Sequence, residues 1–243
     1  MPDKKTLRSV YGMDVCYGCG VCAATCPNHC ITMALSHEGF YVPRVEKKKC
    51  VGCGRCVRVC PKLSPPREEE GTRRTLRADA AWLKDEEALR RSTSGGAVTA
   101  IAHTLAKQNY GFCGVRYMPS TLCAEHFLAE TIEDFAPALG SKYIQSLTQP
   151  AFERLLKEDK KWMVVGTPCQ IFALRRLLRE RRVEERFVLV ELQCHGVPSM
   201  KWWHAFLRMV CANAKTNPRQ VNARWRDKTR GWHDSYQIVL SVD

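Results

Sequence analysis

The chain has 243 residues, of which 45% are hydrophobic and 26% are charged, a composition typical of a globular protein. No apolar run approaches the roughly 18–20 residues that cross a bilayer, so we expect no transmembrane segment. The formal net charge of +13 would suit an anionic cofactor, an acidic redox partner or nucleic acid. No nucleic-acid-binding module accompanies it, so we expect no nucleic acid partner.

Eight of the 14 cysteines form two copies of one pattern, C-x2-C-x2-C-x3-C followed by proline. Three thiolates at i, i+3 and i+6 in a tight loop can face three irons of a cuboidal cluster, while the fourth reaches the other cluster. We therefore predict two [4Fe–4S] clusters with exchanged last ligands. The first would be held by Cys16, Cys19, Cys22 and Cys60, and the second by Cys50, Cys53, Cys56 and Cys26.

Two other uses of these cysteines fit the pattern poorly. Zinc knuckles space two pairs of ligands around an intervening stretch, and disulfides need an oxidising compartment. The N-terminus lacks the apolar stretch of a secretory signal, so we expect reduced thiols and a cytoplasmic location. Glycines at positions 18, 20, 52 and 54 suit loops that wrap closely around sulfide, often with positive φ.

Short apolar stretches at 31–35 and 40–45 surround a His-Glu-Gly turn and predict a hairpin. Cys30 lies beyond a full set of ligands and is interpreted as a core residue. The proline- and charge-rich stretch 64–76 predicts a linker between a ferredoxin-type module at 1–63 and a second domain at 77–243.

The second domain begins with a predicted strand at 78–83 and a short helix at 85–91. A run with helical spacing follows Ser94-Gly95-Gly96. With Ser94 as the N-cap, the glycine amides at such a helix end would suit a phosphate group. A capped helix without a ligand explains the same residues equally well.

Strand-like segments at 112–117 and 123–129 precede a polar and aromatic loop and a predicted helix at 150–160. Apolar segments at 162–165 and 187–192 each end in a loop with glycine and proline. Between them lies an amphipathic helix whose arginines, within 175–186, we expect to face solvent. This order predicts an α/β core with both loops at one sheet edge, where ligands bind. The fold class is therefore α+β, a ferredoxin-type module followed by an α/β domain.

Five motifs in order resemble the beta-subunit family of coenzyme F(420) hydrogenase/dehydrogenase, over roughly residues 80–232. They are Ser94-Gly95-Gly96, Gly140-Ser141-Lys142-Tyr143-Ile144-Gln145-Ser146, Gly166-Thr167-Pro168-Cys169-Gln170, Cys194-His195-Gly196-Val197-Pro198, and Arg226-Asp227-Lys228 before Gly231-Trp232. The resemblance implies an α/β flavin-binding domain with FAD. It also implies clusters that relay single electrons and a small-molecule substrate such as a deazaflavin, coenzyme F(420), or a chlorophyll derivative.

The resemblance and helix-end chemistry together predict a flavin site. Its residues are Ser94, Gly95, Gly96, Ser141, Lys142, Tyr143, Gly166, Thr167, Pro168 and Gln170. Related chains continue past the last motif and carry a further C-x2-C, so we expect this chain to be truncated at its C-terminus.

Cys169 and Cys194 each follow a predicted strand, and parallel strands would bring them together. They would be core residues, a redox-active dithiol, or neighbours of a proton donor, His195. We favour a fourth interpretation, in which they are two ligands of a third [4Fe–4S] cluster beside the flavin, completed in longer chains.

The two cluster motifs and the flavin site implied by the resemblance together favour an iron–sulfur flavoprotein oxidoreductase, whose clusters exchange electrons with a flavin. Its partner would be a redox protein, either a ferredoxin or another oxidoreductase subunit. The alternatives are an electron-transfer subunit without a substrate site of its own and a basic protein with structural clusters. The sequence identifies neither the substrate nor a catalytic residue.

Overall fold

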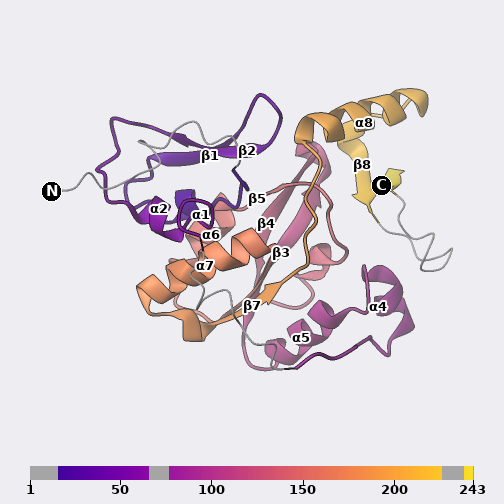
Figure 1. Ribbon diagram of the computed structural model, residues 1–243. Coiled ribbons are helices and arrows are strands. Elements are labelled where there is room, and N and C mark those ends of the chain that lie inside the picture. Colours follow the sequence, from indigo (N-terminus) through magenta and orange to yellow (C-terminus); the bar gives the residue numbers. More distant parts are fainter. Residues whose placement is uncertain (1–15, 66–76, 226–237, 243) are drawn as a thin grey trace.

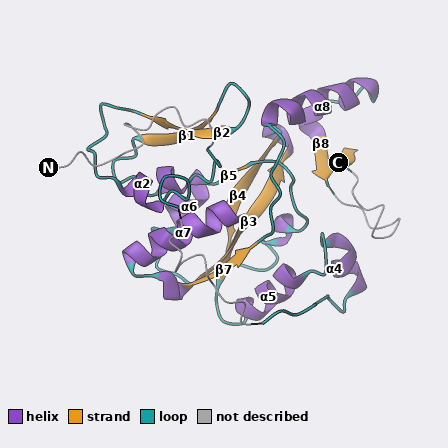
Figure 2. Cartoon of the chain, in the orientation of Figure 1, coloured by secondary structure: helices purple, strands orange, loops and turns teal. Residues whose placement is uncertain are grey.

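The computed structural model describes residues 16–65, 77–225 and 238–242 (Figure 1). A small N-terminal module lies beside a central mixed sheet, and helices cover both faces of that sheet (Figures 1 and 2). Residues 66–76 of the predicted linker and the motif at 226–232 lie outside the described residues. Among the described residues, no helix is both long and apolar enough to cross a membrane.

The N-terminal module consists of two short helices and a hairpin. Helix α1 (Val21–Ala24) and helix α2 (Arg55–Val59) each follow the first cysteines of one run. Strands β1 (Ile31–Leu35) and β2 (Tyr41–Val45) pair in antiparallel fashion, with Ile31 opposite Val45. The predicted hairpin is therefore confirmed.

The central sheet has five strands in the order β5-β4-β3-β6-β7. Strands β3 and β4 form an antiparallel hairpin, and the pairs β4/β5, β3/β6 and β6/β7 are parallel. The four longer strands match predicted segments. The bounds are β3 (Gly111–Met118), β4 (Cys123–Ala129), β5 (Ser146–Leu147), β6 (Trp162–Gly166) and β7 (Phe187–Glu191).

In the described part of the chain, five further helices and a further two-stranded antiparallel pair lie outside the central sheet. They are α4 (Glu86–Arg91), α5 (Ala97–Ala106), α6 (Gln149–Leu155), α7 (Pro168–Arg181), α8 (Met200–Asn213), and the antiparallel pair β8 (Val221–Arg224) and β9 (Val239–Val242). Single 3-10 turns occur as η1 (Pro119–Thr121), η2 (Ala136–Ala138), η3 (Glu184–Arg186) and η4 (Pro218–Gln220). The helix predicted at 150–160 is shorter than expected.

The prediction of a strand at 78–83 is wrong. Residues 77–83 form a loop, and the Trp82 side chain is 71% exposed. Leu83 N donates to Gly95 O at 2.8 Å, which ties this loop to the start of α5. The β-prone residues have no neighbouring strand to pair with, and strand propensity alone does not form a strand.

Alternation along β6 divides the core between the two faces of the sheet. Trp162 and Val164 point toward α6 and α7, whereas Met163 and Val165 pack with α5. The first of these clusters also contains Val21, Ala24 and Val59 from the N-terminal module. The module therefore shares a hydrophobic core with the α/β domain.

Helix α7 also contacts the module through polar groups, chiefly the guanidinium of Arg176. Its predicted apolar stripe is buried, but the arginines that we expected to face solvent are mostly engaged. The Arg176 guanidinium donates to the backbone carbonyls of Arg58, Ser64 and Pro65. Arg58 in turn pairs with Glu180 at 2.5 Å. The expectation of a solvated face is therefore wrong for this part of α7.

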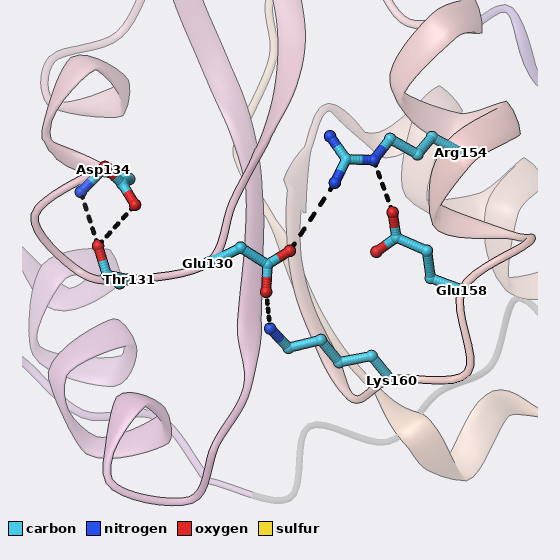
Figure 3. A network of polar contacts seen from close by, with 6 residues as sticks. All are labelled: Glu130, Thr131, Asp134, Arg154, Glu158 and Lys160. Carbon is cyan, nitrogen blue, oxygen red and sulfur yellow. Dashed lines mark hydrogen bonds and ion pairs between the residues drawn. The ribbon is translucent and has the colours of Figure 1, made fainter.

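A polar network fastens the end of β4 to α6 and to the start of β6. Figure 3 shows the Glu130 carboxylate between Lys160 and Arg154, and Arg154 also pairs with Glu158 at 2.6 Å. These groups are substantially exposed, so each pair contributes at most about 1 kcal/mol. The network orients α6, whose other side faces the N-terminal module.

Arg176→Ala should lower the free energy of unfolding of the iron-loaded protein by about 1.5–3 kcal/mol, because three carbonyls lose a charged donor. The matched control is Arg179→Ala on the same helix. Arg179 pairs with Glu184 at the surface, so its loss should cost less than about 1 kcal/mol. Urea denaturation under anaerobic conditions measures both. Equal losses would show that Arg176 does not anchor the module.

Candidate iron–sulfur and flavin site

The second predicted cluster corresponds to a small cavity in the N-terminal module. Its lining includes the four expected ligands, with Cys26 contributed by the first cysteine run as predicted. It also includes Cys30, whose Sγ lies 3.3 Å from Cys26 Sγ. Burial, then Cys26 and Cys50, raise the pKa of the Cys30 thiol to about 12. Cys30 is therefore a core residue, as expected, and it also lines the cluster cavity.

The four thiols assigned to the first cluster also lie together. Burial raises the pKa of Cys22 well above its usual range, and Cys19, Cys16 and Cys60 raise it further. Burial, offset by the Gly18 amide, raises the pKa of Cys16, and Cys60 adds to that rise. Cys60 thus lies with the first run, which supports the exchanged pairing. Buried thiols of this kind need cationic iron to stabilise the thiolate form, so the donor sets fit iron–sulfur clusters.

The ligand loops have the predicted glycine conformation, with φ of +67° at Gly18 and +72° at Gly20. Gly18 N donates to Cys16 Sγ at 3.4 Å. A Cβ at Gly18 would lie 1.8 Å from Gln145 Nε2, and one at Gly20 would lie 1.9 Å from Thr148 Oγ1. These glycines therefore serve a second purpose that the sequence did not reveal, because they admit the α/β domain against the cluster loop.

Three polar side chains of the α/β domain hold the first cluster loop and the hairpin. Gln145 accepts from Tyr41 N at 2.6 Å and donates to Tyr17 O at 3.4 Å. Thr148 Oγ1 donates to Cys19 O at 2.9 Å, and Gln149 Oε1 accepts from Met33 N at 3.0 Å. The segment 145–149 is thus a docking segment. Sequence reasoning had noted only Gln145, as part of a family motif.

The thiol of Cys169 interacts electrostatically with Cys19 of the first cluster set and with Cys194. Burial raises its pKa, the Thr167 hydroxyl at 3.3 Å lowers it, and Cys194 raises it. Cys169 also contributes to the raised pKa of Cys19, after burial. Since β6 and β7 are parallel and paired up to Gly166 and Glu191, the two following loops meet at one sheet edge, as predicted.

Cys194 repeats a local feature of the first cluster loop. Gly196 N donates to Cys194 Sγ at 3.4 Å, and Gly196 has φ of +101°. The same cysteine-x-glycine arrangement occurs at Cys16. Cys194 and His195 are exposed.

The turn between β6 and α7 is built by a capping box. Thr167 is the N-cap, Pro168 follows it in the first turn, and the Gln170 side chain accepts from Thr167 N at 2.9 Å. Gln170 Nε2 also donates to Ser146 Oγ, which lies 3.1 Å from Nδ1 of His126. Burial lowers the pKa of His126 to about 4, so the imidazole is neutral at physiological pH. This buried chain links the Ser146 and Gly166–Gln170 motifs across the sheet.

The helix end at Ser94–Gly96 differs from the prediction. Gly96, with φ of +81°, is the N-cap of α5, and Ser94 precedes it without capping the helix. A Cβ at Gly95 would lie 2.1 Å from Ala81 O, so the backbone of the preceding loop covers that glycine. The expectation that Ser94 caps the helix, with both glycines inside it, is therefore wrong.

Two of the predicted flavin segments do meet. Ser141 N donates to Thr93 Oγ1 at 2.6 Å, which holds the 140–143 loop beside the start of α5. Lys142 Nζ donates to Pro137 O at 2.8 Å and Leu139 O at 3.0 Å. Burial lowers the pKa of Lys142 to about 7. Tyr143 is 37% exposed.

Comparison with protein families agrees with this architecture. Residues 15–63 match a 4Fe-4S dicluster domain, and a second model of that description matches residues 42–113. Residues 159–235 match the C-terminal region of the coenzyme F420 hydrogenase/dehydrogenase beta subunit. The resemblance predicted from the motifs is therefore confirmed for this region of the chain. The matched region contains both Cys169 and Cys194.

One solved structure, the xenon-derivatised F420-reducing [NiFe] hydrogenase complex from Methanosarcina barkeri, contains a similar chain. The identity is 21%, with a TM-score of 0.46, over 66% of this chain and 58% of that chain. The present sequence thus spans less than two thirds of that chain. The search of curated proteins found no match.

Cys60→Ser should remove about four irons per chain, because the last cysteine of the second run completes the first cluster. The matched control is Cys211→Ser. Cys211 is a buried thiol on α8, outside both cluster sets, so its replacement should leave the iron content unchanged. Iron and sulfide analysis after anaerobic purification, with electron paramagnetic resonance, measures the outcome. Unchanged iron in Cys60→Ser would refute the exchanged pairing.

Proposed function

We propose that this protein is an iron–sulfur flavoprotein oxidoreductase. It passes electrons between its two [4Fe–4S] clusters and FAD, and the flavin reduces or oxidises a small molecule, with a deazaflavin such as coenzyme F420 as the first candidate. The observation that carries the proposal is the position of Cys169, whose thiol interacts with both Cys19 and Cys194. The first cluster therefore adjoins the sheet edge where α/β folds bind ligands.

A bound flavin would supply two-electron chemistry on the substrate side and one-electron exchange with the clusters. The chain's own residues would bind its anionic part. The Lys142 ammonium has backbone carbonyls as its hydrogen-bond partners and would gain a phosphate as counter-ion. Ser141, Tyr143 and the Ser94–Gly96 turn lie along the same loops. The first turn of α7, at Gly166 to Gln170, would present a helix N-terminus near Cys169.

Cys169 and Cys194 would be two ligands of a third cluster between the first cluster and the flavin. The Gly196 amide on Cys194 Sγ matches the Gly18 amide on Cys16 Sγ, and such hydrogen bonds tune cluster potentials. Two thiolates do not complete a four-cysteine site, so a longer form of the chain would have to supply the others.

The redox partner would dock at the second cluster. Val51 borders that cavity and is 67% exposed, and the neighbouring Lys47 and Lys48 are also exposed. A small apolar contact with a basic rim suits an acidic partner such as a ferredoxin or another oxidoreductase subunit. This surface also favours the second candidate function, an electron-transfer subunit without its own substrate site. Flavin in protein purified without oxygen separates the two, because only the oxidoreductase requires it.

Lys142→Gln should weaken FAD binding about tenfold, because one charge-assisted contact is lost. Phosphate would raise the Lys142 pKa above its value of about 7, so binding to the parent protein should weaken as the pH rises above 7. The variant should lack this pH dependence. Titration of flavin-depleted protein with FAD measures both effects. Lys107→Gln, exposed after α5, is the control. Unchanged affinity in Lys142→Gln would exclude this flavin site.

A longer form of the protein with a further C-x2-C should hold about four more irons per chain than the present sequence. That gain should disappear in Cys169→Ser and in Cys194→Ser, while Cys123→Ser should retain it. Iron analysis of the anaerobically purified proteins measures the difference. If the longer form binds no additional iron, Cys169 and Cys194 are not cluster ligands.

A further inference from the structure

We infer that Cys30 is an exchangeable ligand of the second cluster, able to replace Cys26 on the iron. Five cysteines border the cavity of this cluster, whereas a cuboidal cluster takes four. The fifth is Cys30, whose sulfur lies 3.3 Å from that of Cys26 and also interacts with Cys50. The inference rests on the dicluster assignment and is independent of the flavin.

The backbone holds both sulfurs in place. Cys26 N donates to Ala23 O at 3.1 Å, directly after α1, and Cys26 O accepts from His29 N at 3.1 Å. Cys30 immediately precedes β1, and its carbonyl accepts from Glu46 N at 2.8 Å. The two thiols are thus presented to one cavity by a short, hydrogen-bonded turn. Either sulfur can face the same corner of a cluster without a change of fold.

Cys113 shows what an ordinary buried cysteine looks like in this protein. It is fully buried on β3 within the core between the sheet and α6, and burial alone raises its pKa. Cys30 differs because its neighbours include two other thiols and the cluster cavity. Cys30 therefore occupies a ligand-like environment.

The exchange is balanced and needs no oxidant or reductant. With the cluster bound, the bond from iron to Cys26 Sγ would break as a bond from iron to Cys30 Sγ formed. The proton of the Cys30 thiol moves to the released Cys26 thiolate across their 3.3 Å contact. The total charge and the oxidation state of the cluster stay the same. The cluster therefore keeps four thiolates throughout a ligand exchange.

The test compares single and double variants of the otherwise unchanged chain, purified anaerobically. Cys26→Ala should keep about eight irons per chain, because Cys30 takes the vacant corner. Cys30→Ala should also keep about eight. The double variant Cys26→Ala/Cys30→Ala should keep about four. Cys53→Ala is the matched ligand control and should also keep about four, because Cys30 lies beside Cys26 and would not reach the corner that Cys53 leaves vacant.

Electron paramagnetic resonance of the reduced proteins provides a second readout. Cys26→Ala should retain the signal of the second cluster with shifted g-values, since the new thiolate comes from a different backbone position. Loss of four irons in Cys26→Ala, as in Cys53→Ala, would overturn the inference. Loss of four irons in Cys30→Ala alone would also overturn it, because Cys30 would then be an obligatory ligand.

Discussion

The contact between the 145–149 docking segment and the first cluster loop is the constraint on which the rest of the structure depends. Three side chains of this segment form hydrogen bonds with backbone groups of the module, namely Gln145, Thr148 and Gln149. These bonds position the module and do not involve the module's side chains. Backbone recognition of this kind requires close approach, and the glycines of the loop provide it. The shared core of α1, α2, α6 and α7 then stabilises an orientation that the polar contacts have selected.

That orientation gives the thiols an order along the molecule. The second cluster cavity borders exposed residues, the first cluster set lies against the α/β domain, and Cys169 follows at the end of β6. The parallel pairing of β6 and β7 adds Cys194 at the same edge. Cysteines from three different parts of the chain thus extend from the exposed second cluster cavity to the edge of the central sheet.

Much of this arrangement could be predicted from the sequence, because cysteine spacing and strand periodicity are local signals. The dicluster module, the hairpin and the strands at 112–117 and 162–165 follow from such patterns. Arg176 and Thr148 could not be predicted, since their partners lie more than 100 residues away in sequence. Ser94 was misassigned because a serine before two glycines resembles an N-cap, whereas the fold uses Gly96.

The shared core also makes iron loading a folding event for more than the module. Val21 lies one residue from the predicted ligand Cys22, and Val59 one residue from the predicted ligand Cys60, yet both valines pack with α6 and α7. The free energy of metal binding would therefore also stabilise the folded α/β domain. With the proposed ligands, the clusters would have to be inserted before or while the two parts close. A chain that closed first would enclose Cys22 and Cys56, which are buried in the finished fold, before iron reached them.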